Sequence, residues 1–402
     1  MNATSRRSVL GLIGAAPLAA GGVAGASAPA ARVPRELRPG GELDRYLTEL
    51  AEEGTFTGSV LLTHRGDTVL ARSHGMANRD AGIANAPDTI FHLGSGTKLF
   101  TAVAVAQLAR RGALRFQDPI GRYADGFPPE IAETVTVHHL LTHSAGMGNF
   151  QQSAEYQDQA PTWETHDEMM NGILDIVRAT RLDYAPGAGQ RYSNSGYVTL
   201  GAVLAGAAER NYFAYIREHV FQAADMTTAD FSSKHEWRTN PLFARPYTHQ
   251  DTESEEPVDA IERHDSTGTP AGGSFASCRD LDRFCQALRS GDLLDPASVS
   301  LVLTPKAPLL RPPPQEPPTR PTAEGAEAFY TYGASTYVAG DRWAVERGGD
   351  SPGVSVGFTV FQPDNDWVLV SLSNVDALPR DGQKISPARL ITDEATRILG
   401  ER

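Results

Sequence analysis

A serine and a lysine stand three residues apart in the segment Phe91-His92-Leu93-Gly94-Ser95-Gly96-Thr97-Lys98. When such a pair lies at the start of a helix, the two side chains share one face, with Cβ atoms about 5–6 Å apart. The residues that follow, 99–108, are apolar on nearly every side, which predicts a buried helix. The spacing therefore brings an amine within reach of a hydroxyl beside a hydrophobic core.

This pair is suited to nucleophilic catalysis. Burial of Lys98 disfavours its charged form and lowers the pKa of its amine. A neutral amine takes the proton of the Ser95 hydroxyl, which attacks poorly until it loses that proton. The start of the helix adds a field that favours developing negative charge. We therefore predict Ser95 as nucleophile and Lys98 as its base.

The composition supports a chemical reason for the lysine. The chain has 36 basic residues, of which four are lysines: Lys98, Lys234, Lys306 and Lys384. Arginine is the usual cation here, and at position 98 it would fail as a base because its guanidinium stays protonated. Because a serine and a lysine three residues apart also occur by chance, the residues around them must show whether the pair belongs to a catalytic site.

A second candidate group is Arg191-Tyr192-Ser193-Asn194-Ser195-Gly196-Tyr197. A phenol beside a lysine cation has a lowered pKa and shuttles protons, and an amide holds both a lysine and a substrate carbonyl. Tyr192 and Asn194 are the candidates. The alternative is a turn in which Asn194 caps a helix that starts near Gly196.

A third candidate group is Glu346-Arg347-Gly348-Gly349-Asp350-Ser351-Pro352-Gly353. Glycines on a strand let a substrate approach the backbone, where an N–H group joins an oxyanion hole. The guanidinium of Arg347 is suited to binding a substrate carboxylate through two hydrogen bonds. The alternative is a glycine-rich hairpin turn with a solvated arginine.

The order of elements predicts the architecture. A helix over 42–53 precedes a hairpin with strands at 57–63 and 68–74. Helical patterns dominate to about residue 290, strands return at 343–346, 354–361 and 367–373, and 387–400 form a closing helix. We expect an α/β (α+β) fold with an antiparallel sheet from about 42–100 and 325–402, flanked by helices, and a helical subdomain over about 101–300.

Three polar or proline-rich segments, 151–169, 250–268 and 304–323, read as loops. Solvated surface is the simplest interpretation of each. Loops of this length in compact domains are also often substrate walls.

The first 28 residues have the layout of an export leader, separate from the folded domain at 29–402. Two adjacent arginines, Arg6 and Arg7, precede an apolar run rich in alanine and glycine, and small residues then offer a cleavage site. Paired arginines indicate the twin-arginine route. We expect a secreted or periplasmic protein of bacterial type.

Charge and cysteine content exclude several classes. The net charge of −13 argues against nucleic acid as a partner and against docking on an anionic membrane, and no other segment is long and apolar enough to span a membrane. Cys278 and Cys285 lie seven residues apart in a predicted helix, too far for a disulfide. No metal or organic cofactor is expected.

Together the three groups resemble the serine β-lactamase and penicillin-binding protein superfamily, specifically the branch of class C β-lactamases, D,D-carboxypeptidases and related esterases. The resemblance covers nearly the whole mature chain. It extends to segments outside the three groups: Gly58-Ser59-Val60-Leu61-Leu62, Gly75-Met76-Ala77-Asn78-Arg79, Thr89-Ile90-Phe91, Leu140-Leu141-Thr142-His143-Ser144-Ala145-Gly146, Ala271-Gly272-Gly273 and Leu372-Ser373-Asn374. It implies that Ser95 forms an acyl-enzyme, and that Lys98 and Tyr192 manage the protons.

The resemblance further implies that Asn194 orients lysine and substrate, and that the N–H groups of Ser95 and Asp350 form the oxyanion hole. The third motif departs from the family's usual Lys-Thr-Gly or His-x-Gly. Arg347 keeps a cation there but is unable to transfer protons, and the Asp350 carboxylate would cancel it or repel an anionic substrate. We therefore rank β-lactam hydrolysis below peptidase or esterase activity.

The sequence thus predicts a hydrolase of a small molecule or short peptide, of the D,D-carboxypeptidase or esterase type. The alternatives are a true β-lactamase and a catalytically weak penicillin-recognising binding or sensor protein. A rival site is the cluster of His138, His139 and His143, where two histidines have the spacing of a zinc pair. Leu140 stands where a metalloprotease motif has glutamate, so helix-end packing is the preferred interpretation of these histidines.

Overall fold

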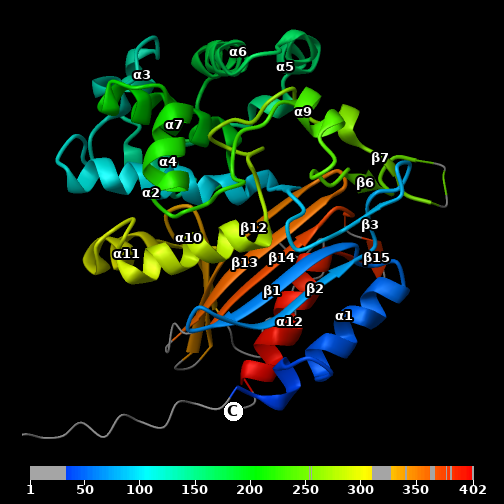
Figure 1. Ribbon diagram of the computed structural model, residues 1–402. Helices are drawn as coiled ribbons and strands as arrows, with labels where there is room; N and C mark the ends of the chain where they lie inside the picture. Colours follow the sequence, from blue (N-terminus) through cyan, green and yellow to red (C-terminus); the bar gives the residue numbers. More distant parts are fainter. Residues whose placement is uncertain are drawn as a thin grey trace, which may run out of the picture. The chain divides into compact units, whose positions relative to one another are not determined.

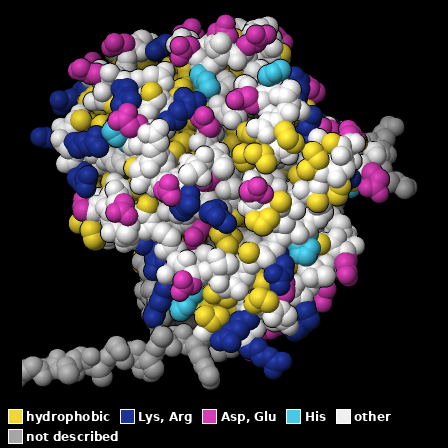
Figure 2. All heavy atoms as spheres, viewed as in Figure 1, with side chains coloured by type: hydrophobic (Ala, Val, Ile, Leu, Met, Phe, Trp, Pro, Cys, Tyr) yellow, Lys and Arg dark blue, Asp and Glu magenta, His cyan; other side chains and the backbone are white. Residues whose placement is uncertain are grey.

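The computed structural model describes residues 33–252, 254, 256–309, 327–339, 342–362, 367–376, 378–380 and 383–400. The predicted leader, 1–28, and most of the predicted connector at 304–323 lie outside these residues. Among the helices that are described, none is both long and apolar enough to cross a membrane. On the face shown in Figure 2, acidic and basic side chains are interspersed.

The centre of the fold is an eight-stranded antiparallel sheet in the order β2-β1-β14-β13-β12-β11-β10-β9 (Figure 1). β1 near the N-terminus pairs along its length with β14 near the C-terminus, from Gly58 opposite Ser373 to His64 opposite Trp367. The predicted fold class is therefore confirmed. The strands are β1 (Gly58–His64), β2 (Asp67–His74), β9 (Ala307–Pro308), β10 (Glu327–Tyr330), β11 (Ser335–Ala339), β12 (Arg342–Ser351), β13 (Val354–Gln362) and β14 (Trp367–Ser373).

Two helices from opposite ends of the chain cover one face of the sheet. α1 (Glu42–Glu52) and α12 (Pro387–Gly400) contact each other, and α12 packs on β13 and β14. α1 has leucines at 43, 47 and 50, a helical spacing that puts them on one face, and all three are buried. They join α12 and the sheet in one apolar cluster with Leu62, Leu369 and Ile391.

The other face of the sheet carries the helices that position the candidate site. α10 (Cys278–Ser290) packs on β1 and β14, and its two cysteines are buried free thiols. α2 (Thr97–Arg110) is enclosed by α7 (Asn194–Ala208), α8 (Tyr212–Ile216) and α11 (Pro296–Leu303). Every residue of α2 from 97 to 108 is buried, as the all-round apolar pattern predicts.

The remaining elements are short, apart from α6. The helices are α3 (Pro129–Ala132), α4 (Val137–Leu141), α5 (Ala154–Gln159), α6 (His166–Ala179) and α9 (Lys234–Thr239). The strand pairs outside the main sheet are β3 (Met76–Asn78) with β4 (Ile83–Ala84), β5 (Phe91–His92) with β8 (Phe275–Ala276), β6 (Tyr247–Thr248) with β7 (Val258–Asp259), and β15 (Leu378–Arg380) with β16 (Gln383–Ile385).

One predicted loop, 151–169, is largely helical. It contains α5 and the start of α6. Both helices begin in this segment because a serine or threonine side chain caps each N-terminus. Ser153 accepts a hydrogen bond from the Tyr156 N–H, and Thr165 forms a capping box with Glu168. The polar composition reflects exposure rather than irregular backbone.

Candidate active site

Ser95 lies in a single 3-10 turn, Gly94–Gly96, that leads directly into α2. Gly94 has φ +48°, a left-handed backbone conformation that residues other than glycine adopt only with strain. Lys98 follows in the first turn of α2, with none of its surface exposed. The local sequence therefore fixes both residues on one face at the beginning of a buried helix.

The predicted catalytic side chains meet around one hydroxyl. The Ser95 Oγ lies 2.6 Å from the Tyr192 Oη and accepts a hydrogen bond from the Lys98 Nζ at 3.1 Å. The Lys98 amine also donates to the Asn194 Oδ1 at 2.8 Å and to the main-chain carbonyl of Ala271. Lys98 is thus held by three acceptors, and Ser95 has a proton-transfer partner on two sides.

Asn194 is free to hold the lysine because another residue caps α7. The N-cap is Ser193, whose hydroxyl accepts from the Gly196 N–H at 3.0 Å. Asn194 is the first helical residue, and its amide donates to the Gln151 Oε1 while its carbonyl faces Lys98. The alternative interpretation of Asn194 as the helix cap is therefore wrong.

Burial and charge shift the pKa values of both proton carriers. Desolvation lowers the pKa of Lys98 to about 8, although the nearby Tyr192 opposes that change. Burial would raise the pKa of Tyr192, but the cations Lys98 and Arg347 outweigh it and lower the pKa to about 7. Tyr192 keeps 37% of its whole surface exposed, while its hydroxyl stands among these cations. Both shifts bring the two groups toward neutral pH, where each is able to exchange a proton.

Arg347 lies at the site but is engaged with the catalytic residues themselves. Its Nε donates to the main-chain carbonyl of Ser95 at 2.8 Å, and an Nη lies 3.5 Å from the Tyr192 Oη. The residue is 9% exposed. Its cation stabilises a phenolate at Tyr192, a contribution that the sequence did not suggest.

The two glycines of the third motif face opposite sides of β12. A Cβ placed on Gly349 would lie 2.8 Å from the Ser95 N and 2.7 Å from the Gly96 N, closer than real Cβ contacts. A Cβ on Gly348 would instead lie 3.4 Å from the Val356 carbonyl, away from the nucleophile. Because Gly349 has no side chain, β12 contacts the turn that carries Ser95 at this residue.

The main-chain N–H and the side-chain carboxyl of Asp350 lie in different parts of the structure. A Cβ on Gly94 would lie 3.5 Å from the Asp350 N, so this N–H is close to the Ser95 turn. The carboxyl hydrogen-bonds with Ser355 and Ser386 near the start of α12, and alternation along β12 puts it on the face opposite Arg347. Arg347 still acts on this carboxyl through its charge and lowers the pKa of Asp350, but the two side chains form no ion pair within the described residues.

Asp350 is exposed as a residue, yet its carboxyl is crowded by protein atoms. This desolvation and the nearby Glu346 carboxylate raise the pKa of the Asp350 carboxyl to about 6, although Ser355 and Ser386 hydrogen-bond to it.

The contacts of His138, His139 and His143 are those of packing and helix capping. The His138 Nδ1 lies 2.8 Å from the Tyr332 Oη, and the His139 Nδ1 accepts from the Thr136 N–H in a capping box. Within the described residues no group of three or more His, Cys, Asp or Glu side chains is arranged to hold a metal. His143 accepts from the Ser193 N–H, and its ring packs 4.5 Å from the ring of Tyr192.

His143 and the Ala271 carbonyl contact catalytic side chains, and Gln151 contacts Asn194. The sequence analysis did not predict these three roles. Burial and the cations Lys98 and Arg347 hold the pKa of His143 well below its usual value, so a neutral ring supports Tyr192. The Ala271 carbonyl acts through its main chain, for which residue type gives no signal. The segment Ala271-Gly272-Gly273, which belongs to the family resemblance, was the one available hint.

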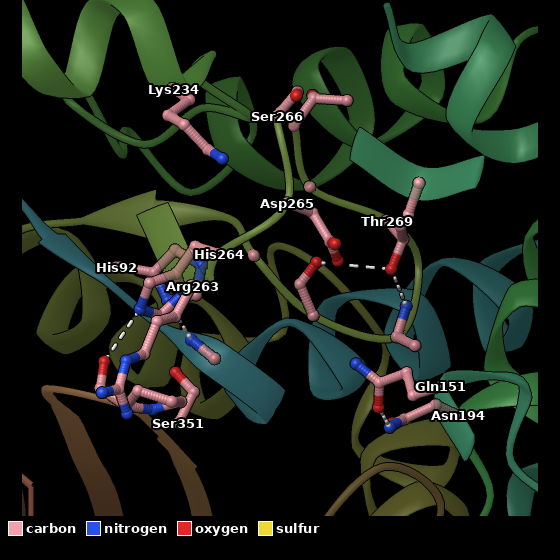
Figure 3. Close-up of a pocket in the computed structure, with 18 of the residues that line it drawn as sticks. His92, Gln151, Asn194, Lys234, Arg263, His264, Asp265, Ser266, Thr269 and Ser351 are labelled. Carbon is pink, nitrogen blue, oxygen red and sulfur yellow. Dashed lines mark hydrogen bonds between the residues drawn. The ribbon is translucent and has the colours of Figure 1, made fainter. Parts of the chain in front are cut away.

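A cavity of about 520 Å³ opens beside Ser95 (Figure 3). Its walls come from the Ser95 turn, α5 and the residues before it, the start of α9, the loop 262–273 and the end of β12. Two of the predicted polar loops, 151–169 and 250–268, thus contribute cavity walls. Tyr192 and Arg347 stand outside these walls.

The fold and this arrangement of serine, lysine and phenol define a hydrolytic enzyme of the serine β-lactamase and penicillin-binding protein superfamily. The family model described as Beta-lactamase matches residues 43–394, so the chain belongs to the Beta-lactamase family. This confirms the resemblance that the motifs indicated and the prediction of a hydrolytic enzyme.

The named relatives include a putative penicillin-binding protein and an esterase. The chain is 26% identical to the putative penicillin-binding protein PbpX of Bacillus subtilis (strain 168), over 85% of this chain and 75% of that protein. It is 32% identical to the esterase EstB of Burkholderia gladioli, over 59% of this chain and 62% of that one.

Solved structures share the fold. The penicillin-binding protein of Bacillus halodurans superposes with a TM-score of 0.71 at 24% identity, covering 88% of this chain and 99% of that one. The D-amino acid amidase of Ochrobactrum anthropi SV3 complexed with D-phenylalanine gives 0.73 at 21% identity, covering 90% of this chain and 100% of that one.

Proposed function

We propose that the protein is an exported serine hydrolase that cleaves a small amide or ester through an acyl-enzyme, of the D,D-carboxypeptidase or esterase type. The observation that carries this proposal is the position of the Ser95 Oγ, 2.6 Å from the Tyr192 Oη and 3.1 Å from the Lys98 Nζ. A nucleophile with a base in direct hydrogen-bond contact is the arrangement that covalent catalysis needs.

In acylation, the Tyr192 phenolate accepts the proton of the Ser95 hydroxyl while Oγ bonds to the substrate carbonyl carbon. The cations Lys98 and Arg347 lower the pKa of the phenol and so favour a phenolate at Tyr192. Lys98 and Arg347 stabilise the phenolate. The N–H groups of Ser95 and Asp350 bind the charge that develops on the carbonyl oxygen.

The Tyr192 hydroxyl then returns the proton to the leaving amine or alcohol as the scissile bond breaks. In deacylation, Tyr192 takes a proton from water, whose oxygen attacks the acyl-enzyme, and the proton returns to the Ser95 Oγ as the acid departs. Asn194 holds Lys98 throughout and presents its amide beside Gln151 at the cavity wall.

The relatives support this range of chemistry, since they are named as penicillin-binding proteins and an esterase. The paired arginines and apolar run of residues 1–28 support export. Export is tested by expressing the full chain in a bacterium with a twin-arginine pathway and sequencing the N-terminus of the mature protein. A cytoplasmic, unprocessed chain would contradict it.

The catalytic proposal is tested with one set of variants and one substrate panel. Wild-type protein, Ser95→Ala and the control Ser300→Ala, an exposed serine on α11, are treated with a fluorophosphonate and with a fluorescent penicillin. They are then assayed on p-nitrophenyl esters, D-Ala-D-Ala peptides and a chromogenic β-lactam. We expect labelling and turnover in wild type and Ser300→Ala, and neither in a folded Ser95→Ala protein.

Each other outcome has a defined meaning. Labelled Ser95→Ala protein would contradict the assignment of the nucleophile. Stable labelling by penicillin without turnover of any substrate would favour the penicillin-recognising binding or sensor protein. Preferential turnover of the β-lactam would identify a β-lactamase.

A further inference from the structure

The cavity beside Ser95 lies on the side where the acyl part of a substrate would sit. In the proposed function Tyr192 gives its proton to the leaving group, so the leaving group lies toward the phenol. Tyr192 and Arg347 stand outside the cavity walls, whereas Ser95, Gln151 and Asn194 belong to them. In the proposed function the acyl group occupies this cavity, which opens from Ser95 beside Gln151 and Asn194.

One wall of this cavity is aromatic and uncharged. The rings of His92 and Trp237 are stacked with centroids 4.9 Å apart, and His264 meets both edge-on. Burial lowers the pKa of His264 to about 4 and the pKa of His92 well below its usual value. At neutral pH neither histidine contributes charge to the cavity.

Two opposite charges face the same space without contacting each other. Lys234 extends from the start of α9 toward the cavity, and the Asp265 carboxylate lies at its wall (Figure 3). Burial raises the pKa of Asp265 overall, and the hydrogen bond from Tyr156 and the charge of Lys234 oppose that shift. Among the described residues, no ion pair within 4.0 Å involves either side chain.

One carboxylate oxygen of Asp265 is held by a hydrogen bond, and the other is available to a ligand. The Tyr156 hydroxyl donates to its Oδ1 at 2.5 Å, which fixes the carboxylate. In the described part of the chain no hydrogen bond to Oδ2 is found. An ionised carboxylate has about four lone-pair sites, so acceptor capacity remains for a ligand.

Lys234 occupies a position that general electrostatics disfavours. It is the first residue of α9, where the helix field opposes a cation, in a chain that has four lysines. In the described residues its ammonium has no hydrogen-bond or ion-pair partner. A ligand anion in the cavity would supply that partner.

The other charged residues that line the cavity are engaged elsewhere. The Glu262 carboxylate bonds to Arg238, and the Arg263 guanidinium donates to the carbonyls of Gln250 and Asp251. The Asp350 carboxyl bonds to Ser355 and Ser386. Lys234 and Asp265 are therefore the charges that a ligand in the cavity meets.

We infer that Lys234 and Asp265 select a substrate whose acyl group ends in both a carboxylate and an ammonium group, as an α-amino acid does. The carboxylate binds Lys234 and the ammonium binds Asp265, while the chain between this end and the reactive carbonyl lies along the aromatic wall. This inference rests on the proposed function, because it names the acyl group of the same reaction.

The test uses p-nitrophenyl esters in a series of acyl chain lengths. Each length is made in four forms: with no charged end, with an amine, with a carboxylate, and with both on one carbon. We expect the form with both charges to have the highest kcat/KM at the fitting length. Its advantage over the uncharged form should be about tenfold to a hundredfold, the size expected for hydrogen bonds to charged groups.

Two variants separate the two contacts. With Lys234→Gln, the form with both charges should lose its advantage over the form with an amine alone. With Asp265→Asn, which preserves shape and the Tyr156 contact, it should lose its advantage over the form with a carboxylate alone. Arg263→Gln and Glu262→Gln make the same changes in formal charge at the same cavity and should leave both advantages in place.

The failures of the two proposals are distinguishable. If wild type hydrolyses none of the esters in a Ser95-dependent way, the proposed function fails. If it hydrolyses the uncharged ester and shows no preference for the form with both charges, the inference alone fails. Equal loss in the control variants, or an equal advantage for a single charge, would also overturn the inference.

Discussion

The phenolic oxygen of Tyr192 lies 2.6 Å from the hydroxyl oxygen of Ser95, across 97 residues of sequence. Lys98 is three residues from Ser95, yet its Nζ lies farther from that hydroxyl, at 3.1 Å. A serine hydroxyl has one proton to give. With Lys98 donating to Oγ, we propose that this proton is directed at Tyr192 and that the phenolate receives it.

Removal of the Tyr192 hydroxyl tests this assignment. Tyr192→Phe keeps the ring that packs on His143 but removes the proton acceptor. We expect kcat/KM to fall by about 10²–10⁴, the usual contribution of general acid–base catalysis. Steady-state kinetics on the best ester measures the fall, with thermal unfolding as the folding control. A decrease of less than about threefold would exclude the phenol as the main base.

Lys98 acts in this scheme through its charge on the phenol. Lys98→Met has a similar shape and removes the cation, so the pKa of Tyr192 should rise toward its ordinary value. We expect a loss of about 10²–10⁴ at neutral pH that shrinks as the pH increases. Lys306→Met, at a lysine whose Nζ bonds to Thr304, is the control and should keep the wild-type pH profile. A loss independent of pH would indicate that Lys98 serves as the base.

Arg347 should set the position of the acidic limb of the pH profile. Its cation lowers the pKa of Tyr192, so Arg347→Met raises that pKa and moves the rise of kcat/KM to higher pH. Arg347→Lys keeps a cation and should shift the limb less. An unchanged limb in Arg347→Met would show that the guanidinium does not act on the phenol.

The same variant tests the predicted role of Arg347 in carboxylate recognition. Substrates with a free carboxylate on the leaving group are compared with their amides in wild type and Arg347→Met. Recognition by the guanidinium requires the carboxylate forms to lose more activity than the amides. Equal losses would leave the contacts to Ser95 and Tyr192 as the functions of this side chain.

Asp350 is expected to act through its N–H group and not through its carboxyl. Asp350→Asn keeps the main chain, so kcat/KM should change by less than about threefold. The raised pKa of the carboxyl means that the folded state binds its proton more tightly than the unfolded chain does. This residue therefore costs stability above about pH 6 and no longer does so at pH values below the unfolded pKa.

Thermal unfolding as a function of pH measures that cost. Asp350→Asn should have a higher Tm than wild type at pH 7 to 8, and the difference should shrink as the pH falls through about 6 toward 4. A difference that grows toward low pH would have the wrong sign and would contradict the raised pKa.

Gly349→Ala tests the contact between β12 and the nucleophile. The added Cβ would meet the main chain of Ser95 and Gly96, which has no flexible side chain to move aside. The turn would shift and the oxyanion hole would lose its geometry, so we expect a loss of about 10²–10³ in kcat. Gly348→Ala, on the other face of the strand, is the matched control and should lose far less.

The sequence by itself determined the parts of the site that depend on neighbouring residues. The spacing of Ser95 and Lys98, in a turn that continues into an apolar helix, sets their shared face because helical geometry is local. The order of elements likewise predicted an antiparallel sheet from both ends of the chain with helices between, and α1, α2 and α12 begin or end within a few residues of their expected positions.

Only the tertiary structure decided which long-range groups complete the site. It assigned the cap of α7 to Ser193 and freed Asn194 for Lys98, brought the Ala271 carbonyl to the same amine, and placed the Asp350 carboxyl on the far face of β12 from Arg347. It also set Lys234 and Asp265 around one cavity. The physical reason is that a turn or helix fixes distances over a few residues, whereas contacts between distant segments depend on how whole elements pack.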